Sequence, residues 1–217
     1  MASNAVEGFL PSRNGFRFAN RWPSGPAWTW QLGLVQLGIG DVGRGLCGGM
    51  AFVAADRFTD GAAPPAEEGP PAFGDPLFRE IVSRQVDSFG RAFQVPARFA
   101  MAAFASDRAR LVHTVRVAWP RVRRSIDDGR LAMVGLVRRS GSALVSPDFG
   151  HQVVAYRYEA SRERVVIGVY DPNHPGDDTV ELVLERAADG SVSLAQSTGE
   201  PLLGLLALPW EPKAPPR

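Results

Sequence analysis

Residues 150–176 read GHQVVAYRYEASRERVVIGVYDPNHPG. Two runs within this stretch, residues 151–158 and 164–170, are rich in valine and tyrosine and flank a polar segment, which is typical of two strands joined by a turn. The second run ends in DPNHPG, which is rich in turn formers. Because antiparallel strands run in opposite directions, we expect the residues after the second strand to lie near the start of the first.

The regions on either side of this hairpin indicate the fold class. Four more β-prone runs, at 131–137, 179–185, 191–196 and 201–208, are separated by Gly, Asp, Asn, Ser and Pro. Upstream, apolar residues recur at intervals of three and four after Cys47, from Asp75 to Phe93, and after the Ser106-Asp107 cap signal, with a kink or a restart at Pro120. Because helices precede strands rather than alternate with them, we expect an α+β fold, with an N-terminal helical lobe packed on a C-terminal antiparallel sheet.

The chain divides by composition into three parts. Residues 1–40 are rich in Gly, Pro and aromatic residues and predict an irregular, extended arm packed on the domain by its rings. Residues 41–210 form the domain, with a helical part at 45–130, a Pro-rich surface linker at 62–73 and a β part at 131–210. Residues 211–217 predict a frayed tail. The rings of the arm are Phe9, Phe16, Phe18, Trp22, Trp28 and Trp30.

Charge and hydropathy exclude several classes of protein. The 24 basic and 23 acidic residues nearly cancel, so no overall field favours nucleic acid or an anionic membrane. No run approaches the roughly 18 apolar residues of a membrane span, and the N-terminus lacks a signal peptide pattern. A single cysteine excludes an intrachain disulfide. We expect a cytoplasmic protein, with export by a signal-less route left open, and the sequence favours no particular oligomeric state.

The one cysteine lies in GDVGRGLCGGM, residues 40–50, where a glycine-rich turn gives way to a helical pattern. This position predicts Cys47 at a helix N-terminus, where a thiol pKa falls and the thiolate becomes a nucleophile. Glycines such as Gly48 let a substrate approach the backbone and leave N–H groups available to an oxyanion. The alternative is that Cys47 is a small buried residue of the core.

Two downstream residues are suited to assist such a thiol. His151 opens its strand directly after a loop, a position that suits a general base. The antiparallel hairpin would bring Asp171 beside it, where a carboxylate can accept the imidazole N–H and fix the tautomer. The alternative for Asp171 is a turn residue that caps its own loop.

These features resemble the papain-like superfamily, and more specifically the C39-like peptidases. The resemblance covers residues 45–52 and 150–176: a Cys that opens a helix after a glycine-rich turn, a Gly-His strand, and a strand that ends in Asp-Pro. It implies a site in the cleft between two lobes and a peptide or protein substrate. Cys47 would be the nucleophile, His151 the general base that later protonates the leaving group, and Asp171 the orienting acid. Asn173 is a substitute third member, because papain uses an amide there.

One position departs from the family. Papain-like enzymes commonly have a Gln six residues before the nucleophile that donates into the oxyanion hole, whereas this chain has Asp41, whose ionised carboxylate only accepts. Gln36 could supply a donor by another path, or the backbone N–H of Cys47 could act alone. This departure weakens the expected hydrolytic efficiency more than the expected fold.

Three functions remain open on these grounds. The first is a cysteine peptidase or related thiol amidohydrolase that forms a thioester acyl-enzyme. The second is a catalytically weak or inactive papain-fold module that binds or scaffolds through its aromatic arm. The third is a protein glutamine deamidase or transglutaminase-like acyl transferase, because these reactions share the first half-reaction.

The remaining motifs favour structural interpretations. His113 lies mid-helix and His174 in a turn, and one Cys with three scattered His predicts no metal site. The GxGxxG match at residues 38–43 lacks its βαβ context, so we expect no cofactor. The basic cluster of Arg121, Arg123, Arg124, Arg138 and Arg139 favours a solvated face over an anion site.

Overall fold

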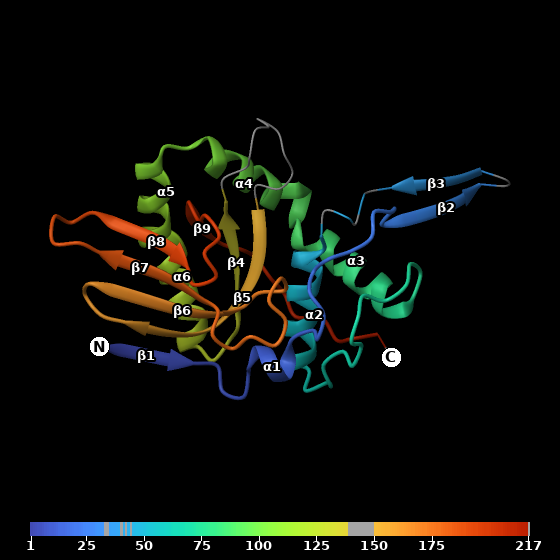
Figure 1. Cartoon of the computed structure of the whole chain (residues 1–217), viewed down its shortest axis with the longest axis horizontal. Helices are drawn as coiled ribbons and strands as arrows, with labels where there is room; N and C mark the ends of the chain where they lie inside the picture. Colours follow the sequence, from blue (N-terminus) through green and yellow to red (C-terminus); the bar gives the residue numbers. More distant parts are fainter. Residues whose placement is uncertain (33–34, 40, 42, 44, 139–149, 217) are drawn as a thin grey trace.

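The computed structural model describes residues 1–32, 35–39, 41, 43, 45–138 and 150–216, with the backbone alone for residues 28–32 and 35–39. The fold combines helices with an antiparallel sheet (Figure 1). Helices come mostly before strands along the chain, as the sequence predicts. Among the described residues, no helix is both long and apolar enough to cross a membrane.

The main sheet has the strand order β8-β7-β6-β5-β4-β9, and every pairing in it is antiparallel. Each of these strands coincides with one of the β-prone runs. An additional strand, β1, pairs with the end of β5 that β4 leaves uncovered. The bounds are β1 Ala2–Ala5, β4 Ala132–Val137, β5 Gly150–Ala160, β6 Arg164–Tyr170, β7 Glu181–Arg186, β8 Val192–Gln196 and β9 Gly204–Ala207.

The register of β5 and β6 confirms the predicted hairpin. Val154 is paired with Tyr170, and a bulge shifts the register between Ala155 and Arg157. His151 lies three residues before Val154 on β5, and Asp171 follows Tyr170 at the end of β6. The hairpin therefore brings the two residues to the same end of the sheet.

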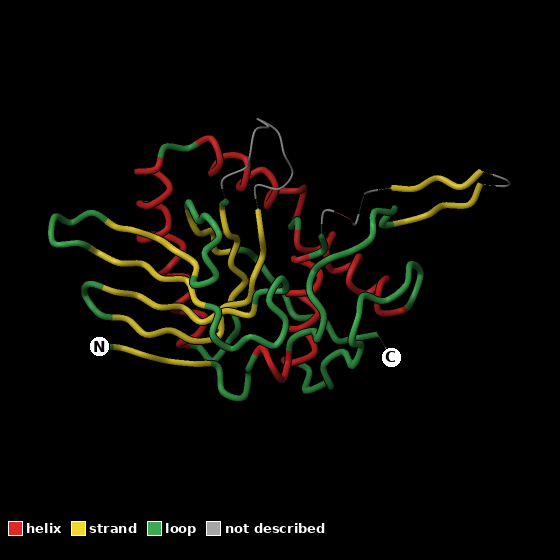
Figure 2. Tube along the Cα trace, viewed as in Figure 1, coloured by secondary structure: helices red, strands yellow, loops and turns green. Residues whose placement is uncertain are grey.

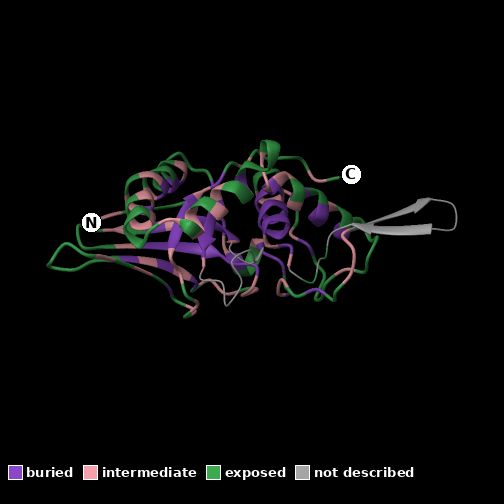
Figure 3. Ribbon diagram, turned by 90° about the horizontal axis from the view of Figure 1, so that it is seen from above, coloured by how far each residue is buried: buried purple, intermediate pink, exposed green. Residues whose placement is uncertain are grey.

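Helices α2 (Cys47–Thr59) and α3 (Pro76–Ser88) pack closely together beside β5 (Figure 1). The core of α2 consists of small and apolar residues, and a β-carbon on Gly49 would lie 2.1 Å from the carbonyl oxygen of Ile81. Asp75 caps α3, since its side chain accepts from the N–H of Leu77. Buried residues concentrate where the helices meet the sheet (Figure 3).

The helix predicted from Asp75 to Phe93 ends earlier than expected. It stops at Ser88, because Gly90 adopts a left-handed conformation with φ of 71°. Phe93 lies in a short 3₁₀ turn, η2 (Arg91–Phe93), and is 62% exposed. A separate helix that the sequence pattern did not predict, α4 (Gln94–Phe104), follows directly.

The helix around Pro120 is interrupted just before the proline and restarts at Trp119, one of the two forms that the sequence predicts. Helix α5 (Asp107–His113), capped by Ser106, passes into a π-helical segment, η3 (Thr114–Ala118), before α6 (Trp119–Asp127). Because proline has no N–H, it cannot donate to the preceding turn, and the hydrogen-bond ladder widens just before it.

The N-terminal arm is more regular than expected. It contains β1, a short helix α1 (Pro11–Asn14) and a hairpin of β2 (Trp28–Leu32) and β3 (Val35–Ile39), which Figure 2 shows apart from the main sheet. The packing of its rings is confirmed for four aromatics, all buried, while the side chains of Trp28 and Trp30 lie outside the described residues. The four buried rings are those of Phe9, Phe16, Phe18 and Trp22.

The start of the C-terminal tail is held in place, so the expectation of a frayed end is wrong there. The carbonyl of Glu211 accepts from Arg84, and the N–H of Lys213 donates to Asp56. Asp56 and Arg84 themselves form a buried ion pair between α2 and α3, at 2.6 Å. The linker at residues 62–73 has no helix or strand, as predicted.

Candidate active site

Cys47 is the first residue of α2. Leu46 precedes it as the N-cap, and its N–H donates to Oδ1 of Asn20 at 2.6 Å, so a side chain of the arm fixes the turn that opens the helix. Cys47 is half-buried. Its position favours a thiolate, because the N-terminus of a helix carries partial positive charge.

His151 and Asp171 lie in direct contact at the end of the β5–β6 hairpin. Nε2 of His151 is 2.5 Å from Oδ1 of Asp171, and both side chains are buried. The carboxylate is fixed by further donors, since its Oδ1 accepts from the N–H of Asn173 at 2.8 Å and its Oδ2 from Nε2 of Gln196 at 2.9 Å. The guanidinium of Arg138 lies 3.7 Å from Oδ2.

The thiol of Cys47 completes the group. Its sulfur interacts with the imidazole of His151 and with the backbone N–H of Gln152, and both interactions lower the thiol pKa. Because Nε2 of His151 faces Asp171, Nδ1 is the nitrogen that can exchange a proton with the sulfur. The structure therefore brings together the three residues that the sequence singled out.

These contacts shift the three pKa values in complementary directions. Burial would raise the pKa of the Cys47 thiol, but the charge and hydrogen bond of His151 lower it below its ordinary value. Burial would lower the pKa of His151, but the negative charges of Asp171 and Cys47 raise it to about 9. Burial likewise opposes the charge of Asp171, yet His151 lowers that carboxyl pKa to about 2. The shifts of Cys47 and His151 both favour the thiolate–imidazolium form over the neutral pair.

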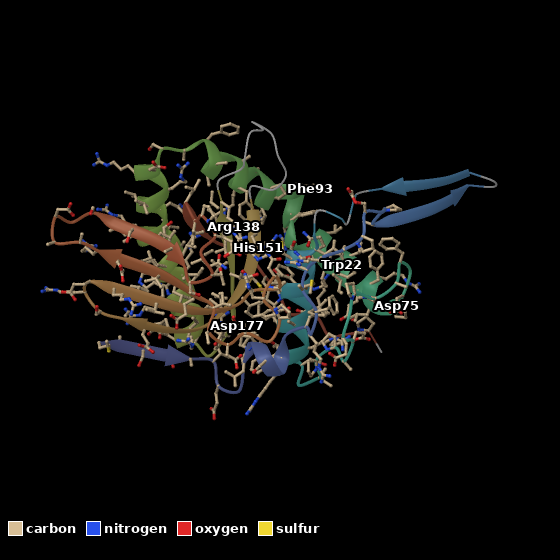
Figure 4. All side chains as sticks on the ribbon, viewed as in Figure 1. Trp22, Asp75, Phe93, Arg138, His151 and Asp177 are labelled. Atoms are coloured by element: carbon tan, nitrogen blue, oxygen red, sulfur yellow. The ribbon has the colours of Figure 1, made fainter. Side chains whose placement is uncertain are left out.

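A groove of about 470 Å³ opens onto the sulfur and the ring. Figure 4 shows Arg138 and His151 on the sheet side and Trp22 toward the helices. Among the described residues that line it, the charged side chains other than the site histidine are two arginines. The lining consists of Asn20, Arg21, Trp22, Gly43, Gly45, Cys47, Arg138, Gly150, His151 and Asn173.

Asn173 does not replace Asp171. Its backbone N–H donates to Asp171, and its side-chain oxygen accepts from Nδ2 of Asn20 at 3.3 Å. His151 contacts the carboxylate of Asp171. Asn173 therefore helps to hold the carboxylate of Asp171 and lines the groove.

The expected oxyanion residues have other positions. Gly48 is buried, and a β-carbon there would lie 2.3 Å from Oγ of Ser88, so this glycine allows α2 to approach α3. The carboxylate of Asp41 accepts from the N–H groups of Gly25 and Gly43 and organises the preceding loop. Gln36 lies on β3, and its side chain is outside the described residues.

Sequence reasoning missed several residues around the groove. Asn20 and Trp22 come from the arm, and no local spacing relates them to Cys47. Arg138 was assigned to a solvated basic face, but its side chain is largely buried and donates to Gln196 at 2.8 Å. One signal for Arg138 was available: it follows directly after a predicted strand, at the end of the sheet where His151 lies. Arg139 lies outside the described residues.

The other two histidines lie outside this group. His113 ends α5, and its pKa is lowered by burial and by the nearby Arg98 and Arg121. His174 lies 3.0 Å from Glu200 in the loop after β6.

Comparison with known proteins gives no relative from which a role could be transferred. No family model, no curated protein and no solved structure matches this chain.

Proposed function

We propose that this chain is a papain-like cysteine peptidase, similar to the C39-like peptidases. The observation that carries the proposal is the 2.5 Å contact between Nε2 of His151 and Asp171, with Cys47 and His151 lining the same groove. A thiol, an imidazole and a carboxylate in this order favour ionisation of the thiol, because the imidazole can take its proton.

The reaction follows from these contacts. The thiolate of Cys47 adds to the carbonyl carbon of a peptide bond, and the C–N bond breaks as His151 gives its proton to the leaving amine. A thioester remains on the sulfur. Water, deprotonated by the neutral His151, then attacks the thioester, and the acid product leaves as the thiol is restored. Asp171 holds the ring in position throughout.

The lobes support a papain-like arrangement. The nucleophile begins a helix that packs on the sheet, and the base and acid come from adjacent strands. The groove between them includes residues of the arm, the helix and the sheet. A peptide could thus contact all three parts of the chain.

The first test uses an activated ester, because the natural substrate is not needed for acylation. We expect wild-type protein to release p-nitrophenolate from p-nitrophenyl acetate in a burst and to carry an acetyl group on Cys47 by mass spectrometry. Cys47→Ser should keep the fold and lose the burst. A burst in that variant equal to wild type would exclude Cys47 as the nucleophile.

Alkylation by iodoacetamide tests the charge state of the pair, and the single cysteine makes any label specific. We expect the rate to stay high well below the ordinary thiol pKa of about 8.5. His151→Ala should shift the profile toward that value, because the thiolate loses its cationic partner. A wild-type profile that rises only near pH 8.5 would contradict the ion pair.

The second candidate is a binding module without turnover. It is favoured by Asp41, which occupies the position of the family's oxyanion donor and acts as an acceptor for two N–H groups. The two candidates differ in the acyl-enzyme, which only the peptidase forms.

A further inference from the structure

The side chains of Cys47, His151 and Asp171 provide no hydrogen-bond donor for the oxyanion that forms during the reaction. When the thiolate adds to the carbonyl carbon, the π electrons move onto oxygen, which then needs hydrogen-bond donors. The N–H of Cys47 at the start of α2 can supply one donor. Asp41 cannot supply a second, because its carboxylate only accepts.

Asn20 offers a side-chain amide at the same groove, and its orientation is determined by its neighbours. Its Oδ1 accepts from the N–H of Leu46 at 2.6 Å and from Nε1 of Trp22 at 3.1 Å. Both partners can only donate, so the oxygen must face them and Nδ2 must face the other way.

The nitrogen of this amide lies beside the turn that precedes the nucleophile. A β-carbon built on Gly45 would lie 2.7 Å from Nδ2 of Asn20, and Gly45 has a φ of 91° that glycine adopts readily. Nδ2 also lies 3.3 Å from Oδ1 of Asn173. An amide nitrogen has two hydrogens, so one remains for a substrate oxygen.

The backbone holds Asn20 in place relative to both halves of the site. Its N–H donates to the carbonyl of Pro172, the residue after Asp171, at 2.8 Å. Its side chain fixes Leu46, the residue before Cys47. Asn20 is therefore tied to both the nucleophile and the orienting acid, as a donor of fixed position requires.

We propose that Asn20 is a catalytic residue whose Nδ2–H donates to the oxyanion of the tetrahedral intermediate, together with the N–H of Cys47. The proposal rests on the proposed function, since it presupposes attack by Cys47 on a carbonyl. It assigns to the arm a part in the chemistry and supplies the donor that the family motif lacks here.

Two variants separate donation from structure. Asn20→Asp keeps an oxygen acceptor for Leu46 and Trp22 but cannot donate when ionised. Asn20→Ser is uncharged, keeps a small acceptor and is too short to occupy the position of Nδ2. Asn14→Asp is the matched control, because Asn14 lies in the same arm and its Oδ1 accepts from the N–H of Leu10.

Each variant is measured with two reagents. Acetylation of Cys47 by p-nitrophenyl acetate passes through an oxyanion, whereas alkylation by iodoacetamide substitutes at a saturated carbon and does not. We expect both Asn20 variants to lose at least about tenfold in the acetylation rate, toward the 10²–10³-fold loss typical of one removed donor. Their alkylation rates at the pH plateau, where the thiol is fully ionised, should stay within about twofold of wild type, and Asn14→Asp should match wild type in both assays.

The outcomes are distinguishable. Acetylation within about threefold of wild type in both Asn20 variants would overturn the role of Asn20 and leave the peptidase proposal intact. A loss in Asn20→Asp alone would assign the effect to the added charge and would also overturn it. Wild-type protein that is acetylated no faster than Cys47→Ser would overturn the proposed function and this inference together. Circular dichroism and melting temperatures confirm that the variants are folded, and Asn20→Ser decides the question if Asn20→Asp is not.

Discussion

Both carboxylate oxygens of Asp171 have hydrogen-bond donors. Oδ1 contacts Nε2 of His151 and accepts a hydrogen bond from the N–H of Asn173. Oδ2 accepts one from Gln196 and has the guanidinium of Arg138 nearby. A carboxylate can accept on both oxygens, whereas an amide accepts on one. The surrounding donors thus require a carboxylate at this position.

Asp171→Asn should therefore lower activity and stability together. Without the full negative charge the pKa of His151 falls from about 9, so the alkaline limb of the acylation profile should move to lower pH. One buried donor would face the amide nitrogen, which should reduce the unfolding free energy by about 1–3 kcal/mol at pH 7. Urea unfolding and the pH profile measure the two effects.

The stability loss in Asp171→Asn should be larger at neutral pH than at acid pH. The folded carboxyl pKa of about 2 lies below the ordinary 3.8, so the stabilisation by Asp171 is fully present above 3.8 and is lost as the pH falls through about 2. The variant should differ from wild type at pH 7 more than at pH 2. Asp189→Asn should show a smaller difference, because the pKa of this exposed carboxyl is lowered only by hydrogen bonds from Ser191 in its own turn.

Gly48→Ala should disturb the packing next to Cys47. The added carbon would lie 2.3 Å from Oγ of Ser88 and 2.8 Å from Nε2 of Gln152, so the start of α2 has to move. We expect a loss of about 1–3 kcal/mol of stability and slower alkylation of Cys47. Gly69→Ala, with open space around it, should be unchanged in both measurements; equal behaviour of the two variants would contradict the tight contact.

At the residue scale, the sequence was sufficient to select Cys47, His151 and Asp171, which lie together, but not the residues around them. Cys47 was recognisable from the glycine-rich turn, and His151 and Asp171 from strand pairing, because each depends on local pattern. Asn20 was not recognisable, since its position depends on the path of the arm across the domain. Contacts between distant segments leave no periodicity in either segment.

Among the secondary-structure elements, the helix pair α2 and α3 depends on a buried charge pair. Arg84 contacts both oxygens of Asp56, at 2.6 and 3.0 Å, and the same carboxylate accepts from Nε1 of Trp210 and the N–H of Lys213. Burial raises the pKa of Asp56 despite these donors. The pair links the two helices to the tail. Removing only one of its two residues is strongly destabilising, because the other charge stays buried without its partner.

Asp56→Ala should destabilise the fold by about 3–5 kcal/mol, because Arg84 remains buried without its main partner. It should also release the tail, so trypsin should cleave after Lys213 faster than in wild type. Asp128→Ala, which removes a partner of the exposed Arg130, should change stability by less than about 1 kcal/mol. Similar unfolding midpoints for the two variants would contradict the importance of the buried pair.

The elements of this chain differed in how well their sequences predicted them. The strands followed from alternating β-branched residues between turn formers, and the interruption before Pro120 from a missing N–H. Helix α4 was missed because Pro96 lies within it, at its third residue, where a proline is tolerated. Strand β1 was missed because ASNA has no β-prone residue and is paired only through its backbone.

For the molecule as a whole, the arm is part of the core. Phe16 is buried to 1% exposure and packs edge-on against Phe18, with ring centroids 5.2 Å apart, and Phe18 in turn contacts Trp22. Trp22 contacts Phe78 on α3. These rings connect the arm to the helical lobe. Asn20 lies between Phe18 and Trp22 in the sequence, so the rings on both sides of it are anchored.

Phe16→Ala should lower the unfolding free energy by about 3–5 kcal/mol, the usual loss for a buried phenylalanine. The acetylation rate of the remaining folded protein should also fall, because the segment that carries Asn20 loses its anchor. Met101→Ala, at a 74% exposed side chain, should change stability by less than about 1 kcal/mol and leave acetylation unchanged. If Phe16→Ala is as stable as the exposed control variant, the arm is not part of the core.

The distance along the chain between Cys47 and Asp171 has a consequence for biosynthesis. More than half of the polypeptide separates the two residues, so during translation the cysteine emerges from the ribosome long before the strands that carry its partners. A nascent chain at that stage has no imidazole in place to lower the pKa of the Cys47 thiol. For the proposed nucleophile, acylation would then wait until β5 carries His151 to the start of α2.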